Sequence, residues 1–256
     1  MLLEILLAIF APLLVPYGPT EYDYAASWQG PSAAHWLGVD DVGRDVLSRL
    51  IMGARVSLSV GLLSQLVVVL IGLPIGAISG LLGGWVDFVV TRVIEIFTAV
   101  PTILLYILML VALGPGFVNI IIAMAVTGWV GIARLVRGQV LSIKATDYVR
   151  AAQAMGANSN EIIVTHLMRN ALSPVLVSLT FGVPGAMFGE AGLSFLGLGI
   201  APPTPSWGQM MGSYQAYIRV AWHLTVFPAI VLGLTMLAWN ILGNGLRDVL
   251  DPSVQN

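Results

Sequence analysis

The sequence contains no cysteine, and only 9% of its residues are charged. Without cysteine the chain can form no disulfide, no thiolate zinc site and no iron–sulfur cluster. It also has a single lysine, Lys144, which is followed by Ala145, whereas a P-loop needs lysine followed by Ser or Thr to hold phosphates. The chain therefore cannot itself be a P-loop ATPase, and any ATP hydrolysis has to come from another protein.

The scarcity of charge indicates the class of protein. A soluble domain carries roughly 25% charged residues, whereas this chain is 57% hydrophobic, with a mean hydropathy of +0.90. Its apolar runs are continuous rather than alternating, which favours helices over a β-barrel. The sequence therefore predicts an all-α membrane protein with six transmembrane helices, within residues 1–16, 56–82, 97–114, 117–136, 171–199 and 224–246.

A polar tail separates the first two segments. Residues 1–16 contain Glu4 and lack the basic flank and cleavage site of a secretory signal. We interpret them as a first membrane helix and leave open whether its natural beginning precedes Met1. Residues 17–55 form an extracytoplasmic tail, in which 40–49 has the mixed charge of an amphipathic helix that either contacts another protein or caps the bundle. Residues 56–256 form a core of five membrane helices.

Basic residues indicate the direction of the spans. If the N-terminus is cytoplasmic, the basic residues on the outer side are Arg44, Arg49, Arg55 and Arg219. Those on the inner side are Arg92, Arg134, Arg137, Lys144, Arg150, Arg169 and Arg247. Most of the inner set lies between positions 134 and 169, and basic residues accumulate in cytoplasmic loops. We therefore expect this loop and both termini to be cytoplasmic.

A polar insert at residues 148–170 interrupts the apolar second half of the chain. Apolar side chains recur at helical spacing in its first part, and Gly156 is typical of a helix end. Asn158 followed by Glu161 predicts the start of a second helix. Composition alone fits a plain solvated loop, whereas the spacing predicts a helix–turn–helix with small residues that let another protein approach closely.

The insert resembles the signature loop of ABC importer permeases, in which Glu-Ala-Ala is followed three residues later by Gly. The letters RAAQAMG at 150–156 match both alanines and the glycine, and HLMRNALSP at 166–174 is similar to the usual His-Ile-Leu-Pro-Asn-Ala ending. Arg150 stands where the motif has Glu, so this chain lacks that carboxylate. Arg169 stands where the motif has Pro, which allows a straighter exit into the fifth span.

Three further stretches resemble the dipeptide, oligopeptide and nickel branch of this family. They are HWLGVDDVGRDVLSRLIMGARVSL at 35–58, GEAGLSFLGLGIAPPTPSWG at 189–208 and NILGNGLRDVLDP at 240–252. The resemblance implies a type I permease fold of six helices with a cytoplasmic coupling helix, in a bacterial or archaeal cytoplasmic membrane. It implies pairing with a homologous permease, two cytoplasmic ABC ATPase subunits and an extracytoplasmic solute-binding protein. The expected cargo is a di- or oligopeptide, with nickel, glutathione or another small solute as alternatives.

The resemblance also implies that the insert, within a coupling loop at 144–170, docks on the ATPase. A short helix held by a partner then moves two spans as a rigid lever. The residues expected to carry this coupling are Tyr148, Ala151, Ala152, Met155, Gly156, Ala157, Asn158, Glu161 and Leu167.

One acidic residue, Glu190, lies within the fifth hydrophobic segment. A charged side chain in the membrane costs roughly 2.5–3.5 kcal/mol on insertion scales and usually faces a cavity or the bundle interior. Glu190 is therefore a candidate for the translocation path. The alternative is a hydrogen-bond partner between helices, which the adjacent Gly and Ser residues favour because they allow close packing.

The remaining polar residues predict no catalytic or metal site. Arg92 and Glu95, three residues apart, are expected to form a solvated or lightly paired juncture near Asp87. His35, His166 and His223 are far apart in the sequence, whereas a metal site needs clustered ligands. We therefore expect no enzyme activity, no cofactor and no nucleic-acid partner.

The residues alone leave two other classes of function possible. A stand-alone secondary transporter could couple to protons through Glu190, although such folds usually carry internal repeats and the sequence contains no evident one. A membrane assembly factor without transport activity has no positive feature in its favour.

Overall fold

The computed structural model describes residues 2–18, 21–147, 149 and 168–250, and the regular elements among them are all helical. In chain order they are α1 (Leu2–Leu14), η1 (Tyr24–Ala26), α2 (Val46–Leu82), α3 (Gly84–Ala99), α4 (Thr102–Leu113), α5 (Phe117–Lys144), α8 (Met168–Phe195), α9 (Trp207–Tyr214), η3 (Gln215–Tyr217) and α10 (His223–Leu250). Within these ranges α2, α5, α8 and α10 are each long and apolar enough to cross a membrane. The predicted all-α membrane fold is confirmed.

The six predicted hydrophobic segments do not each correspond to one straight membrane-spanning helix. Helix α1 is apolar, but its 13 residues reach only about 20 Å at 1.5 Å per residue. The third segment consists of the end of α3 and the whole of α4. The complete helices α3 and α4 qualify together as one span but are bent by 87° at the break between them. The sequence did not predict α3 as a helix because Asp87, Arg92 and Glu95 interrupt its apolar run.

The tail also differs from expectation at residues 40–49. These residues do not form a separate amphipathic helix, because 40–44 make turns and α2 begins at Val46. Asp45 is the N-cap, and its carboxylate accepts a hydrogen bond from the Ser48 amide at 2.8 Å. The helix that starts there continues unbroken into the second hydrophobic segment.

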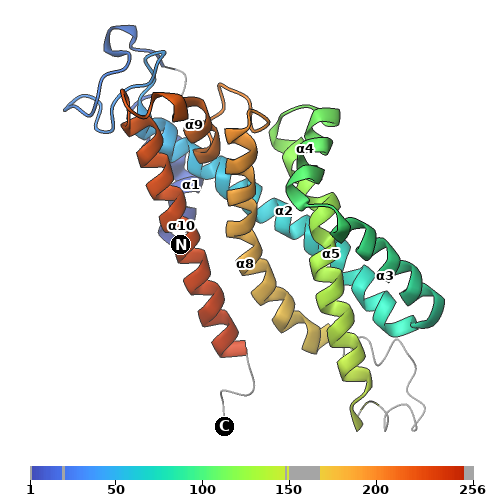
Figure 1. Ribbon diagram of the computed structural model, residues 1–256. Helices are drawn as coiled ribbons and strands as arrows, with labels where there is room; N and C mark the ends of the chain where they lie inside the picture. The colour runs from blue at the N-terminus through green and yellow to red at the C-terminus, as the bar shows by residue number, and fades with distance from the viewer. Residues whose placement is uncertain (1, 19–20, 148, 150–167, 251–256) are drawn as a thin grey trace.

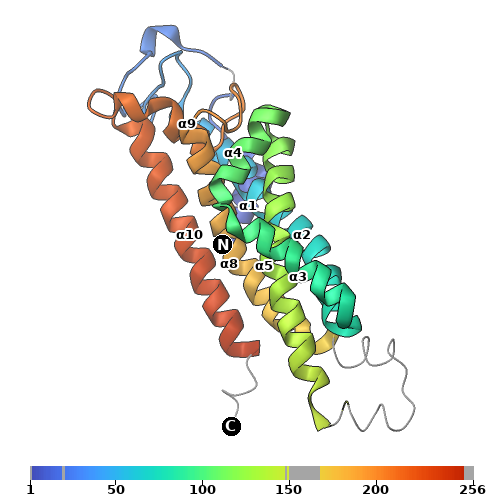
Figure 2. The same cartoon turned by 45° about the vertical axis from the view of Figure 1, so that its right-hand side comes forward.

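The bundle has two ends, which both views separate (Figures 1 and 2). The tail end holds the segment that precedes α2, together with α9. The loop end is where α5 finishes, α8 begins and α10 finishes. Helix α8 therefore runs from the last residues of the polar insert to the tail end.

Glycines bring α2 and α5 into backbone contact. Gly72, Gly76 and Gly80 are spaced by four residues and share one face of α2. A Cβ atom on Gly72 would lie 2.6 Å from the Trp129 carbonyl oxygen, and one on Gly76 would collide with the backbone of Ala133. Small residues at this spacing let membrane helices approach closely, so α2 and α5 form one tightly packed pair.

A buried core near the tail end joins α1, α2, α8, α9 and α10. Trp207, only 2% exposed, lies within it. Its indole N–H donates to the Leu50 carbonyl oxygen at 2.9 Å, and its backbone N–H donates to Ser57 Oγ at 3.0 Å. These two bonds attach the short helix α9 to the first turns of α2.

Candidate functional site

A buried polar network joins the tail end to α8. We call it the tail-end network and define it by Asp40, Arg44, Arg49, Glu190, Ser206, Gln209 and Tyr214. Its members come from two of the sequence stretches that carry the family resemblance, 35–58 and 189–208, and from the first turn and last residue of α9. Stretches more than 130 residues apart in the chain thus meet at one place.

The outer half of this network is built on Asp40, which is 1% exposed. Arg44 Nε donates to Asp40 Oδ2 at 2.6 Å, and Arg44 Nη2 donates to the Tyr214 hydroxyl at 3.2 Å. The Tyr214 hydroxyl in turn donates to Asp41 Oδ1 at 2.6 Å. Because buried charges are tolerated only when paired and hydrogen-bonded, these contacts hold the residues before α2 against α9.

The environment keeps both Tyr214 and Arg44 protonated. Burial, together with the negative charges of Asp40 and Asp41, raises the pKa of Tyr214, so its hydroxyl remains a donor. Burial works to lower the pKa of Arg44, but the charge and hydrogen bond of Asp40, aided by Tyr214, raise it overall. Tyr214 therefore stays neutral and Arg44 stays charged at physiological pH.

Arg49 connects the two halves of the network. It is 1% exposed, and its Nε lies 3.6 Å from Asp40 Oδ2. Its Nη2 donates to Gln209 Oε1 at 3.1 Å, and its Nη1 donates to the Pro203 carbonyl oxygen at 3.3 Å. One guanidinium in the first turn of α2 thus holds the loop before α9 and α9 itself.

The inner half ends at Glu190 in α8. The Gln209 backbone N–H donates to Ser206 Oγ at 2.9 Å, and Ser206 Oγ donates to Glu190 Oε1 at 2.7 Å. Ser194 Oγ, one turn further along α8, also donates to Glu190 Oε1 at 2.7 Å. With 1% exposure, the Glu190 side chain lies inside the subunit. Of its two predicted roles, these contacts favour the hydrogen-bond partner between packed elements over the translocation path.

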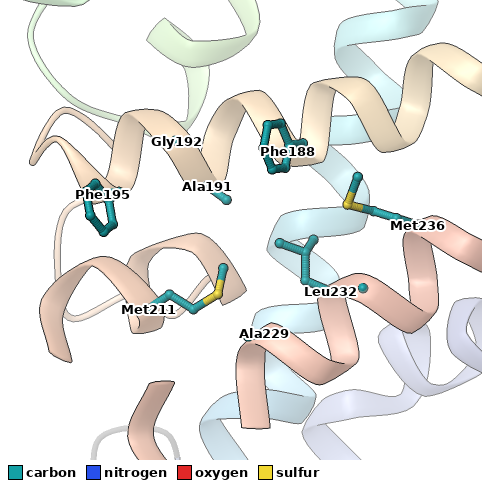
Figure 3. A pocket seen from close by; sticks show the side chains of 9 residues that line it. Phe188, Ala191, Gly192, Phe195, Met211, Ala229, Leu232 and Met236 are labelled. Carbon is teal, nitrogen blue, oxygen red and sulfur yellow. The ribbon is translucent and has the colours of Figure 1, made fainter. Parts of the chain in front are cut away.

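An apolar groove lies beside this region, between α8, α9 and α10 (Figure 3). Its lining includes Phe188, Phe195, Met211, Leu232 and Met236. Glu190 precedes the lining residue Ala191 but does not itself line the groove. The groove therefore offers no charged partner to a polar solute.

A second polar cluster, the loop-end clamp, consists of Ser79, Asp87, Arg137 and Lys144. Arg137 Nε and Nη2 donate to the two oxygens of Asp87 at 2.5 and 2.6 Å, and Ser79 Oγ donates to Asp87 Oδ1 at 2.6 Å. Lys144 Nζ donates to the Leu81 carbonyl oxygen at 2.8 Å. The clamp ties the end of α2 and the start of α3 to the last two turns of α5.

The loop-end clamp fixes the point where the chain enters the polar insert, because Lys144 is the last residue of α5. Sequence spacing had grouped Asp87 with Arg92, five residues away, whereas the structure pairs it with Arg137, fifty residues away. No sequence signal available for one chain could have identified that partner. The nine residues predicted to carry ATPase coupling, between Tyr148 and Leu167, lie outside the described residues.

Arg92 and Glu95 pair with each other on the surface of α3. Arg92 Nη1 donates to Glu95 Oε2, and the two side chains are 60% and 51% exposed. This agrees with the lightly paired juncture predicted from their spacing.

These features define a helical membrane protein with one polar cluster at each end of its bundle. The polar insert follows the loop-end clamp in the chain. The chain belongs to the family of binding-protein-dependent transport system inner membrane components, whose family model matches residues 72–256. It is thus an ABC importer permease subunit and not an enzyme, and ATP hydrolysis belongs to a separate subunit.

Curated relatives match along nearly the whole chain. The dipeptide transport system permease protein DppC of Bacillus subtilis (strain 168) is 43% identical, covering 97% of this chain and 78% of the relative. The oligopeptide transport system permease protein OppC of the same strain is 43% identical, covering 99% and 83%. The glutathione transport system permease protein GsiD of Pectobacterium atrosepticum is 41% identical, covering 100% and 85%.

Solved structures support the fold. A chain of the MetNI methionine ABC transporter in an inward-facing conformation matches with a TM-score of 0.66 at 23% identity, over 79% of this chain and 96% of that one. A chain from the crystal structure of an amino acid ABC transporter with histidines matches with a TM-score of 0.62 at 18% identity, over 78% and 94%.

Proposed function

We propose that this permease moves di- or oligopeptides across the cytoplasmic membrane, as one half of a heterodimer with a homologous permease. Two cytoplasmic ABC ATPases drive the cycle, and an extracytoplasmic solute-binding protein delivers the cargo. The observation that carries the proposal is the 43% identity to two permeases named for dipeptide and oligopeptide transport over almost the entire chain. The third relative transports glutathione, which is itself a peptide derivative.

Reconstitution tests this proposal. The permease pair, both ATPases and the binding protein in proteoliposomes should accumulate alanyl-alanine when ATP is supplied, and omission of the ATPases should abolish uptake. Uptake by this chain alone without ATP would instead support a proton-coupled transporter working through Glu190. Binding of nickel rather than peptide to the cognate binding protein would transfer the cargo assignment to the metal.

The proposed orientation places the loop end, and with it the insert and the C-terminus, in the cytoplasm, and the N-terminus is proposed to face the same side. It is supported by the basic residues between Arg134 and Arg169. The C-terminal end of α10 lies at the same end of the bundle as the end of α5 (Figures 1 and 2). In this orientation the tail, 17–48, and the exposed start of the 201–209 segment, residues 201–204, face outward and form the docking surface for the binding protein.

Cysteines at two exposed tryptophans test the orientation and the docking surface together. Trp36, in the tail, is 71% exposed, and Trp85, at the start of α3, is 75% exposed. In intact cells, a membrane-impermeant thiol reagent should label Trp36→Cys but not Trp85→Cys. Trp36→Cys fitted with a photoactivatable crosslinker should also capture the loaded binding protein. Labelling of Trp85→Cys alone would reverse the orientation, and labelling without capture would remove the tail from the docking surface.

A further inference from the structure

Arg92 and Glu95 lie on α3, which is long and apolar enough to enter a membrane only together with α4. Helices α3 and α4 qualify as a span together, although they are bent at their junction. Arg92 and Glu95 are both more than half exposed on this subunit. Charged side chains on membrane helices are rarely directed at lipid and instead face a water-filled cavity or another protein. The exposed pair therefore marks a side of α3 that lipid does not cover.

Four exposed residues form one stripe along this side of α3. Phe88, Arg92, Glu95 and Ala99 follow at spacings of four, three and four, which places them on one helix face. The Arg92 guanidinium lies 5.0 Å from the centre of the Phe88 ring, within the range of a cation–π contact. The stripe therefore combines a charged pair with an aromatic surface that helps hold it in place.

The opposite side of α3 is already occupied. Ile94 is 4% exposed and packs in a cluster with Trp129, Val130 and Ala133 of α5. The Phe97 ring also meets the Trp129 ring at a centroid distance of 5.8 Å. Because α5 holds this side, the direction of the exposed stripe is fixed relative to the rest of the subunit.

The stripe ends at the break in the span. Helix α3 finishes at Ala99 and α4 starts at Thr102, and Val100 and Pro101 between them are both exposed. The Pro101 carbonyl oxygen accepts from the Leu104 and Leu105 N–H groups at 2.9 and 3.4 Å, and other groups at the two helix ends lack partners within their own helices. Irregular backbone at membrane depth is tolerated only where protein covers it or where it lines a water-filled cavity. The break and the charged pair thus point to the same conclusion.

We propose that Arg92 and Glu95 form a substrate-recognition pair on the wall of the translocation path. Arg92 binds the carboxylate of a zwitterionic peptide, and Glu95 binds its ammonium group. Side chains three residues apart have Cβ atoms roughly 5–6 Å apart, which is comparable to the roughly 7 Å span of two extended residues. This inference rests on the proposed function and names the part of the cargo that the permease itself contacts.

The resting contact between the two side chains suits this role. An exposed ion pair contributes little to stability. Arg92 and Glu95 can therefore separate and bind the two ends of a peptide instead of each other. A guanidinium also forms two parallel hydrogen bonds with a carboxylate, which makes it selective for that group. The pair is therefore available when no cargo is present and is easily displaced when cargo arrives.

Transport by the complete reconstituted complex provides the first test, with alanyl-alanine as the probe. Arg92→Gln and Glu95→Gln should each lower the initial uptake rate about tenfold, since one charge-assisted hydrogen bond corresponds to about that factor. Complex assembly should stay near wild type, which separates the loss of uptake from misfolding. Wild-type uptake in both variants would overturn the inference. Failure of the wild-type complex to transport the peptide would instead overturn the proposed function.

Thiol labelling provides a readout that a purely structural ion pair would not affect. The chain has no natural cysteine, so Ala99→Cys on the stripe and Val93→Cys on another side of α3 can be compared directly once partner thiols are removed. An impermeant thiol reagent should modify Ala99→Cys but not Val93→Cys, and alanyl-alanine supplied during turnover should slow that modification. An unreactive Ala99→Cys, or equal labelling with and without peptide, would show that the stripe does not line the path.

Discussion

Replacing Gly76 with valine should prevent α2 from packing on α5 and sharply reduce the recovery of folded protein. A Cβ atom at position 76 would collide with the carbonyl oxygen of Ala133, and backbone cannot rotate away as a side chain can. Overpacking a helix interface typically costs about 1–3 kcal/mol and occasionally more. For a chain of this size, that corresponds to a drop in melting temperature of roughly 2–12 °C, at the upper end here because two backbones must separate.

Gly131→Val is the matched control for this prediction. Gly131 lies on α5, one of the same two helices, but a Cβ atom built there meets no atom within 4 Å. The control should therefore match wild type in membrane insertion, in yield after purification and in thermal unfolding followed by circular dichroism. Equal melting of Gly76→Val and Gly131→Val would show that the two helices do not need backbone contact at position 76.

Replacing Gly156 with valine should uncouple ATP hydrolysis from transport. The helix end predicted at Gly156 needs a left-handed residue, which glycine adopts freely, whereas a β-branched residue costs on the order of 1–2 kcal/mol or more. The strain would merge or tilt the two helices predicted for the insert and remove them from their proposed docking site on the ATPase. Because the spans are unchanged, the variant should insert and pair with its partner permease. Its ATPase subunits should dissociate, or hydrolyse ATP without responding to loaded binding protein.

Ala157→Val places the same side chain one position along and controls for bulk in the insert. The measurements are recovery of the four-subunit complex and the stimulation of ATP hydrolysis by loaded binding protein. Normal assembly together with normal stimulation in Gly156→Val would identify this turn as an ordinary loop and refute the coupling assignment.

Membrane character, approximate span positions and family could be predicted from the sequence. Long apolar runs can be recognised in the sequence, because a segment that is surrounded by lipid must be apolar regardless of which other segments pack against it. The family resemblance in residues 35–58 and 189–208 was also local. It identified stretches that matter without indicating that they meet, because contact between them depends on how α2, α8 and α9 pack.

The tertiary structure alone decided the partners of the polar residues. Spacing placed Asp87 near the Arg92–Glu95 pair and gave it no partner of its own, whereas α3 packs beside α5 and brings Arg137 to it. Glu190 had two predicted roles, and the adjacent Gly and Ser residues favoured a hydrogen-bond partner between helices over a path residue. Its hydrogen bonds from Ser194 and Ser206 favour the same role.

The bend between α3 and α4 and the uninterrupted start of α2 likewise required the structure. Hydropathy records how apolar a segment is, but not the direction in which the chain continues. An N-cap such as Asp45 becomes evident only when its hydrogen bond to Ser48 is seen. The sequence therefore determined which segments enter the membrane. Packing between residues 50 to 170 positions apart determined which side chains became buried partners. It also left others exposed, such as Arg92 and Glu95. The sequence could not show this, because no local pattern encodes contacts between distant residues.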